Sequence, residues 1–405
     1  MIQIISGGVC AAQGFSAAGV HCGIRRNKSK KDLALIYSDV PAQAAAVYTA
    51  NRVQGVPIAV TRRHLADGIA RAVICNSGNA NTCNADGEIV AEQMCALTAK
   101  ELGLDADDVA VASTGVIGQP LDLTPIAAGL PTLVAALSED GGADAADAIM
   151  TTDTRRKEIA VEFTLGGKIC HLGGMAKGSG MIHPNMATML VFITTDVHIP
   201  SHVLQIALHD DCKTSFNMVS VDGDTSTNDT VLVLANGEAG NAPVAFDSAD
   251  YAIFREALQT VTVYLCREIA RDGEGATRLL TCQVAGAADV LTARKAAKAV
   301  ICSSLVKAAG FGADANWGRV LCALGYGVPE LEPDNVDVSF RSAAGEITVC
   351  IAGRGIAFDE DVAKEILVQP EVTIAVSLGG GKHTAEAWGC DLTYDYVKIN
   401  GNYRT

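Results

Sequence analysis

The feature that most constrains the fold is a β-hairpin pattern near the centre of the chain. Residues 158–165 (EIAVEFTL) carry an apolar side chain at every second position, which is the period of a half-buried strand. One face of this strand holds Ile159, Val161, Phe163 and Leu165. Gly166-Gly167 forms a two-residue turn, and residues 168–172 return as the partner strand. The pattern predicts antiparallel pairing in this part of the protein.

Strand and helix patterns alternate over the rest of the chain. Further strands are predicted at the start of 70–82 and at 32–39, 44–53, 109–113, 188–197, 231–236, 336–340, 346–352 and 372–378. Helices are predicted at 90–101, 201–209 and 251–272, with Ser201 as an N-cap and Gly103 as a C-cap. No linker or fixed-period repeat divides the chain, and GxGxxG units do not recur. We therefore expect an α/β fold with mixed or antiparallel sheets.

Composition narrows the class of protein. The 405 residues are 49% hydrophobic and 19% charged, enough for one large domain or two around a shared core. The formal charge of −15 argues against nucleic acid and anionic membranes as partners, because such binding needs Lys and Arg facing phosphates. We recognise no signal peptide and no run of about 18 apolar residues, and expect a cytoplasmic protein. The 13 scattered cysteines lack a CxxC pair and are interpreted as reduced core residues, not metal ligands.

The Gly-rich segment 173–181 (GGMAKGSGM) admits several interpretations. Its order differs from that of a phosphate-binding loop, because Lys177 precedes Gly178-Ser179. A flexible turn with a solvated Lys177, a substrate-binding loop and a Schiff-base lysine for pyridoxal phosphate all fit the residues alone.

Three other polar segments carry weaker signals. Residues 221–230 (VDGDTSTNDT) have their Gly at the wrong place for a calcium loop and lack a closing Glu, so we expect a turn supporting a site or a solvated loop. Residues 311–319 (FGADANWGR) are interpreted as a Trp-anchored corner whose Asn and Asp bind backbone groups. His183 lies five residues before Thr188, but neither a GxSxG elbow nor an Asp partner accompanies it, which favours a turn residue.

Residues 183–190 (HPNMATML) have the layout of a self-cleaving peptide bond. Thr188 stands at the head of an apolar strand, after the small Ala187 and a Gly-rich loop. Its hydroxyl can attack the Ala187 carbonyl through a five-membered ring, and hydrolysis of the resulting ester exposes a new α-amino group. That amine has a reference pKa of about 7.7–8.0, so a nucleophile and its base then lie in one residue. A plain β-strand residue is the alternative interpretation of Thr188.

These motifs resemble those of the ornithine acetyltransferase family, also called glutamate N-acetyltransferase. The similarity is almost letter for letter in GMAKGSGMIHPNMATML and covers nearly the whole chain. The other matching segments, in chain order, are GFSAAGVHCGIRRNKSKKDLALIYSD, CNSGNANTCNADG, STGVIGQPL, SVDGDTSTNDTV, DGEGATRL, GADANWGRVLCALG and INGNYRT. The resemblance implies cleavage between Ala187 and Thr188 into fragments 1–187 and 188–405 that fold together in one α/β unit.

The resemblance also assigns roles to individual residues. Thr188 matches the family's nucleophile, and Thr114 and Gly115 match its oxyanion hole. A strand that runs into Thr-Gly can direct a hydroxyl and a backbone N–H at a developing oxyanion. The substrate-binding positions are matched by Thr151, Lys177, Thr188, Glu274, Asn400 and Thr405. Of these, Lys177 can pair with a carboxylate and Glu274 with an ammonium, which suits amino-acid substrates.

The reaction implied by the resemblance is a ping-pong acetyl transfer. N-acetylornithine acylates Thr188, ornithine leaves, and glutamate takes the acetyl group; some family members also accept acetyl-CoA. The chemistry needs no metal or other cofactor. The family fold is an αββα sandwich of the DmpA/ornithine-acetyltransferase type, self-cleaving with an N-terminal nucleophile, and two α and two β fragments form a heterotetramer. The alternatives are a DmpA-like self-processing aminopeptidase and a non-catalytic amino-acid-binding protein.

Overall fold

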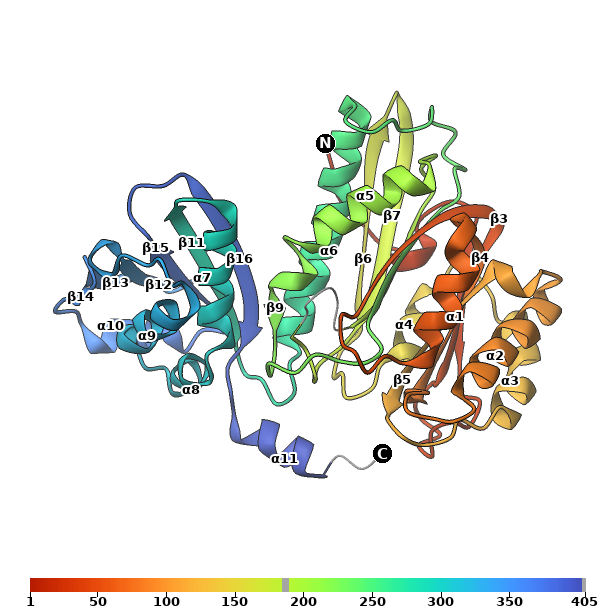
Figure 1. Cartoon of the computed structure of the whole chain (residues 1–405), viewed down its shortest axis with the longest axis horizontal. Helices are drawn as coiled ribbons and strands as arrows, with labels where there is room; N and C mark the ends of the chain where they lie inside the picture. The colour runs from red at the N-terminus through yellow and green to blue at the C-terminus, as the bar shows by residue number, and fades with distance from the viewer. Residues whose placement is uncertain (184–188, 403–405) are drawn as a thin grey trace.

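The chain forms two lobes, each built around its own β-sheet (Figure 1). This computed structural model describes residues 1–183 and 189–402. Helices flank both sheets, so the expected mixed α/β architecture with two sheets is confirmed. In the described ranges no helix is both long enough and apolar enough to cross a membrane.

The larger sheet mixes parallel and antiparallel neighbours. The described part of the chain gives it nine strands, in the order β1 (Gln3–Ile5), β6 (Lys157–Leu165), β7 (Lys168–Lys177), β8 (Leu190–Thr195), β10 (Thr230–Ala235), β3 (Leu33–Tyr48), β4 (Ile69–Asn79) and β5 (Val109–Val116), with β2 (Phe15–Val20) paired to β3. β8 runs parallel to β10, and β4 runs parallel to β5. The remaining pairs in this sheet are antiparallel.

The predicted hairpin is confirmed. β6 and β7 pair antiparallel up to Leu165 and Lys168, and Gly166 and Gly167 form the turn with φ values of 53° and 81°. Two positive φ angles in a two-residue loop are those of a type I′ turn, which glycine adopts without a steric penalty.

The prediction of separate strands at 32–39 and 44–53 is wrong, because β3 runs unbroken from Leu33 to Tyr48 and so joins the first range to the beginning of the second. The pairing of β3 with β4 is interrupted between Tyr37 and Ala42, and Pro41 lies in this gap. A proline lacks the N–H that a ladder requires, so it is tolerated at such an irregularity without ending the strand.

The second sheet belongs to the C-terminal lobe, apart from one short strand. Its described strands follow the order β14 (Arg354–Gly355), β13 (Gly345–Ile351), β12 (Asp337–Ser342), β15 (Glu371–Ser377), β11 (Leu279–Ala287), β16 (His383–Cys390) and β9 (Val219–Ser220). The strands predicted at 336–340, 346–352 and 372–378 are thus confirmed.

Helices cover both faces of the larger sheet and one flank of the second. They are α1 (Val56–His64), α2 (Gly87–Leu102), α3 (Thr124–Ala135), α4 (Gly142–Ile149), α5 (Ser201–Cys212), α6 (Ala249–Arg271), α7 (Val290–Cys302), α8 (Ser304–Gly312), α9 (Trp317–Gly327), α10 (Glu360–Leu367) and α11 (Tyr394–Asn402). Along β4, Val73 and Cys75 pack in the cluster that includes α4, whereas Ala72 and Ile74 pack in the cluster of α1, α2 and α3. Alternate side chains of β4 therefore pack on opposite faces of the larger sheet.

The three predicted helices are present with limits that differ by up to three residues, and one predicted cap is wrong. α2 ends at Gly103, whose φ of 68° is the left-handed C-cap conformation expected there. Asn316 caps α9 by accepting the N–H of Arg319, as expected of a Trp-anchored corner. Ser201 is not an N-cap: Pro200 occupies that position and Ser201 is already the first helical residue. Proline holds the extended backbone that precedes the helix, which leaves the serine one step inside.

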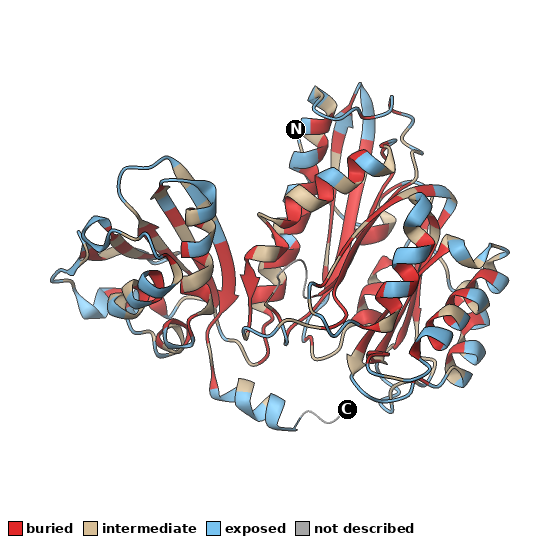
Figure 2. Cartoon of the chain, viewed as in Figure 1, coloured by how far each residue is buried: buried red, intermediate tan, exposed pale blue. Residues whose placement is uncertain are grey.

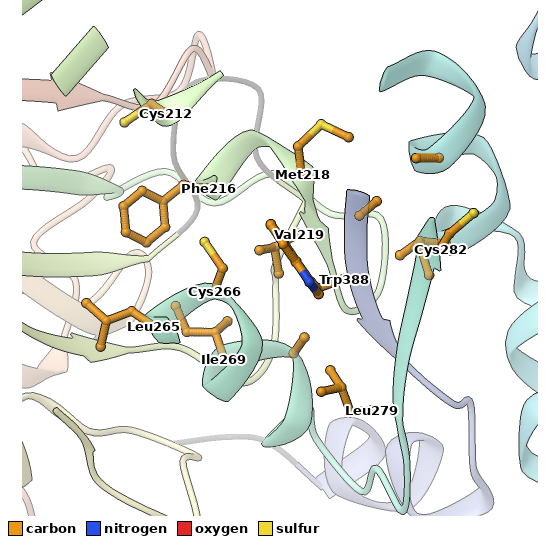
Figure 3. Packing of buried hydrophobic residues seen from close by; sticks show 14 of the residues in the cluster. Cys212, Phe216, Met218, Val219, Leu265, Cys266, Ile269, Leu279, Cys282 and Trp388 are labelled. Carbon is orange, nitrogen blue, oxygen red and sulfur yellow. The ribbon is translucent and has the colours of Figure 1, made fainter. Parts of the chain in front are cut away.

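A continuous apolar core joins the two lobes. Buried residues line both sheets and the helix faces against them (Figure 2). At the joint, Ile269 of α6, Val219 of β9 and Trp388 of β16 belong to one buried cluster, which also includes Leu265 on the side of α6 toward the larger sheet (Figure 3). α6 contacts strands of both sheets. Its C-terminal end, and the residues that follow it, therefore lie between the two lobes.

Candidate active site

Six of the residues predicted to bind substrate or stabilise the oxyanion line one cavity of about 130 Å³. They come from five separate segments of the chain and are Thr114, Gly115, Thr151, Lys177, Glu274 and Asn400. The predicted residues Ala187, Thr188 and Thr405 lie outside the described residues.

The Thr114-Gly115 wall is built by the parallel pair β4 and β5. Both residues lie within β5, which extends to Val116, three residues past the end of the strand predicted at 109–113. Gly115 has a φ of 135°, and a Cβ at this position would lie 2.3 Å from the carbonyl carbon of Gly78. Only glycine allows β5 to approach β4 so closely while turning its backbone in this way. Thr114 is 9% exposed, and its hydroxyl oxygen lies 3.4 Å from Lys177 Nζ.

Asn228 binds the backbone next to Thr114 and so helps to position this wall. The sequence did not single it out as a site residue. Its side-chain amide donates to the carbonyls of Ala80 at 2.6 Å and Ser113 at 2.9 Å, and its oxygen accepts the Thr82 hydroxyl at 2.7 Å. Asn228 therefore holds the residue that precedes Thr114. The only signal in the sequence was the polar stretch 221–230, which gave no reason to single out one of its residues.

Lys177 ends β7 and is buried at the cavity. Burial lowers the pKa of its ammonium group, and the positive charges of Lys157 and Arg25 lower it further, while the carboxyl groups of Asp153 and Asp229 act in the opposite direction. The net shift is downward. An ammonium group that lines the cavity is suited to bind a substrate carboxylate.

Asp229 is a second buried carboxyl group near Lys177. Burial raises its pKa well above the ordinary value, against the opposing effects of Ser226, Lys177 and Thr49. Within the described chain its Oδ2 atom has no hydrogen-bond partner. This environment disfavours the ionised form of the carboxyl group.

Glu274 follows α6 and supplies the negative side of the cavity. Its N–H donates to the Ser179 carbonyl at 2.9 Å, and its Oε2 accepts the Asn400 side-chain amide at 2.7 Å. A Cβ on Gly180 would lie 2.4 Å from the Glu274 carboxyl carbon. The Gly-rich segment thus lines the cavity and makes room for Glu274, which supports the substrate-loop interpretation. The same segment is partly regular structure, because residues 173–177 belong to β7.

Asp222 ties this loop to the C-terminal helix. Its carboxylate accepts the N–H groups of Met181 at 2.6 Å and Ile182 at 2.9 Å, and the Tyr396 hydroxyl donates to it at 3.3 Å. Tyr396 lies on α11, the helix that brings Asn400 to Glu274. Residues 221–230 therefore form a turn that supports the site.

His183 does not form part of a hydrolase-type relay in the described residues. Its Nδ1 lies 3.1 Å from the Ser220 hydroxyl oxygen and 3.5 Å from Cys302 Sγ. Burial lowers its pKa to about 4, with Lys298 adding to the shift, so the imidazole is neutral at pH 7. This agrees with its interpretation as a local structural residue.

A second cavity, of about 910 Å³, lies against one face of the second sheet and includes Arg294, Arg341 and Trp388. None of the six candidate residues that the structure describes lines it. Size alone would favour this cavity, but the chemically complementary groups meet in the smaller one. The part of the chain that the structure describes contains no cluster of three side chains suited to hold a metal ion.

An α/β protein whose cavity combines a lysine ammonium, a carboxylate and a Thr-Gly strand wall has the groups that bind a small polar molecule. Comparison with known proteins makes this specific: the chain belongs to the ArgJ family, whose sequence model matches residues 16–405.

Relatives of the chain carry the same family name. An arginine biosynthesis bifunctional protein ArgJ from Symbiobacterium thermophilum is 52% identical over 406 residues, covering 100% of both chains. The crystal structure of an arginine biosynthesis bifunctional protein argJ from Bacillus halodurans is 44% identical with a TM-score of 0.50, covering 52% of this chain and 98% of that one. A structure of ornithine acetyltransferase complexed with ornithine, from Mycobacterium tuberculosis, is 38% identical with a TM-score of 0.43, covering 46% of this chain and 100% of that one.

Proposed function

We propose that this protein is the acetyltransferase of arginine biosynthesis that moves the acetyl group of N-acetylornithine to glutamate. The observation that carries the proposal is the meeting of Lys177, Glu274 and the Thr114-Gly115 wall at one cavity, from segments far apart in the chain. N-acetylornithine and glutamate both have a carboxylate for Lys177, and ornithine also has a side-chain ammonium for Glu274. The names of the ArgJ relatives point to the same pathway.

Catalysis is proposed to pass through an acetyl ester on Thr188. The Thr188 hydroxyl oxygen attacks the acetyl carbonyl carbon, and its proton moves to the free α-amino group of the same residue. Thr114 and Gly115 stabilise the resulting oxyanion until the C–N bond breaks. The departing ornithine amine takes the proton. Glutamate then attacks the ester with its amino group, and Thr188 recovers its hydroxyl proton.

The free amine at Thr188 requires cleavage of the Ala187–Thr188 bond, so the active form consists of fragments 1–187 and 188–405. The Bacillus halodurans structure supports this proposal: 98% of that chain corresponds to only 52% of this one, as a single fragment would. We further propose that two cleaved copies assemble as a heterotetramer and that the enzyme works in the cytoplasm. The word bifunctional in the relatives' names extends the proposal to acetyl-CoA as a second donor.

The decisive experiment combines mass spectrometry with a transfer assay. Wild-type protein should give two fragments and convert N-acetylornithine and glutamate into ornithine and N-acetylglutamate with ping-pong kinetics. Thr188→Ala should stay uncut and inactive, whereas Thr188→Ser, which keeps a hydroxyl, should cut and retain part of the activity. An uncut wild-type chain with full activity would contradict the mechanism. Release of acetate that is indifferent to glutamate would instead favour the aminopeptidase-like alternative.

A further inference from the structure

Next to the cavity lies a buried group of three charged residues, Asp153, Lys157 and Asp272, here called the Lys157 cluster. Lys157 is the first residue of β6, and its side chain is completely buried. Its Nζ lies 2.6 Å from Asp153 Oδ1 and 2.6 Å from Asp272 Oδ2. The two carboxylates are buried as well, with side-chain exposures of 0% and 2%. None of the three lines the cavity itself.

Asp153 connects this cluster to two segments that do line the cavity. It accepts the N–H of Gly178 at 2.7 Å and the N–H of Thr151 at 2.9 Å. Gly178 directly follows Lys177. One carboxylate therefore fixes the backbone of one substrate-binding candidate and the backbone next to another.

Asp272 connects the cluster to the segment after α6 that carries Glu274. It ends α6 two residues before Glu274, and its carboxylate accepts the N–H of Thr154 at 3.0 Å together with the Thr154 hydroxyl. The N–H of Glu274 in turn donates to the Ser179 carbonyl, which belongs to the loop that Asp153 holds. Lys157 thus links the Lys177 side and the Glu274 side of the cavity through two direct contacts.

Stability alone is a weak reason to bury these charges. Removing ions from water costs free energy that their mutual attraction often fails to recover, and apolar replacements of buried ion pairs are frequently as stable. What a buried, fully hydrogen-bonded network provides is strict geometry, because each partner accepts only a narrow range of distances and angles.

We propose that Asp153, Lys157 and Asp272 are positioning residues that set the spacing between the Lys177 ammonium and the Glu274 carboxylate, and so select substrates by the separation of their charged ends. The proposal rests on the function proposed above. It concerns residues that touch the backbone of the binding segments and not the substrate.

Asp153 also has an electrostatic effect that a purely structural carboxylate would lack. The charged groups that face Lys177 are Asp153, Lys157, Asp229 and Arg25, and Asp153 is the stronger of the two acids that raise the pKa of Lys177 against the effect of burial. Neutralising Asp153 should therefore lower the pKa of Lys177 further. The protonated lysine that binds a carboxylate would then be lost at a lower pH.

The test compares three conservative variants of the full-length protein by KM for N-acetylornithine as a function of pH. Asp153→Asn should raise KM, with a loss in kcat/KM of up to about 100-fold for misplaced binding groups. The rise of KM at high pH, here called the alkaline limb of the KM profile, should move to lower pH in this variant. Asp272→Asn should raise KM without moving that limb, because Asp272 is not among the charges that face Lys177. Asp196→Asn is the matched control: Asp196 is also a buried carboxylate and accepts the N–H of His171 at 2.7 Å, but His171, unlike Thr151 and Lys177, does not line the cavity. It should lower the melting temperature and leave KM unchanged.

The outcomes separate the two proposals. A folded Asp153→Asn protein with wild-type KM and an unmoved alkaline limb would overturn the positioning role. An equal loss of kcat/KM in Asp196→Asn would do the same, since it would reduce the effect to general destabilisation. If Asp153→Asn does not fold, Asp272→Asn decides: a raised KM supports the proposal and an unchanged KM overturns it. Wild-type protein without any acetyl transfer would overturn the proposed function, and this inference with it.

Discussion

The two ends of β7 carry similar polar groups in different surroundings. Near Lys168, where the strand begins, the buried Asp196 accepts the N–H and the imidazole Nδ1 of His171, each at 2.7 Å. Near Lys177, where the strand ends, the buried Asp153 accepts the N–H of Gly178 at 2.7 Å. Burial and hydrogen bonding are alike at the two ends.

The two ends differ in whether the backbone bonded by the carboxylate is adjacent to residues that line the cavity. At the Asp196 end the bonded groups join the first part of β7 to the end of β8, and neither Asp196 nor His171 lines the 130 Å³ cavity. At the Asp153 end the bonded backbone leads directly to cavity-lining side chains. A buried carboxylate therefore does not identify a functional site; the convergence of its neighbours on a cavity does.

The largest contrast between the two ends should come from their buried threonine hydroxyls. Thr114→Val removes a proposed oxyanion donor, and loss of such a donor typically costs about 10²–10³ in kcat. Thr195→Val, at the other end, removes a hydroxyl that donates to the His171 carbonyl at 2.7 Å, and should cost only about 1 kcal/mol of stability. Steady-state kinetics on protein shown to be cleaved, with thermal unfolding of both variants, measure the contrast. Equal kcat values in the two variants would remove Thr114 from the mechanism.

The two lysines of β7 should differ mainly in KM. Lys177→Met removes a charge-assisted contact worth about 1.5–3 kcal/mol, which corresponds to roughly 10- to 150-fold in KM for N-acetylornithine. Lys168→Met, at the exposed start of the strand, should change neither KM nor kcat.

The same pair tests the pH dependence. Because burial lowers the pKa of Lys177, its carboxylate-binding ammonium form is lost as pH rises through a value below that of an ordinary lysine. Wild-type KM should therefore increase on the alkaline side, at a pH where Lys168→Met still behaves like wild type, and Lys177→Met should lack this limb. A wild-type alkaline limb that persists unchanged in Lys177→Met would assign it to another group.

The smallest expected effect comes from a glycine. In Gly180→Ala the new methyl group meets the Glu274 carboxylate, whose flexible side chain can move away from the cavity. Losing one contact of this kind costs about 0.5–1.5 kcal/mol, or roughly 2- to 12-fold in KM. Gly380→Ala, in the other lobe, places its methyl group in open space and should be silent. A silent Gly180→Ala would show that the Glu274 carboxylate has no fixed position in the working enzyme.

Much of the local structure could be predicted from the sequence, because it depends on neighbours in the chain. The hairpin of β6 and β7 follows from period-two apolar residues around Gly166-Gly167, and the end of α2 follows from Gly103. The strand β3 was divided in error because Pro41 is a reliable strand breaker only where its N–H would be needed. The positions of the site residues came from family motifs; their roles stay predictions.

The sequence by itself determined the hairpin of β6 and β7, the strands β12, β13 and β15, the end of α2 and the family to which the chain belongs, since each of these is written in local patterns and motifs. Only the tertiary structure decided which distant residues support the site. Asn228 reaches Ala80 across 148 positions, and Lys157 reaches Asp272 across 115. Such pairs depend on which strands become neighbours and on how α6 packs between the two sheets. No local pattern encodes that choice, because it is made by the burial of apolar surface over the whole chain.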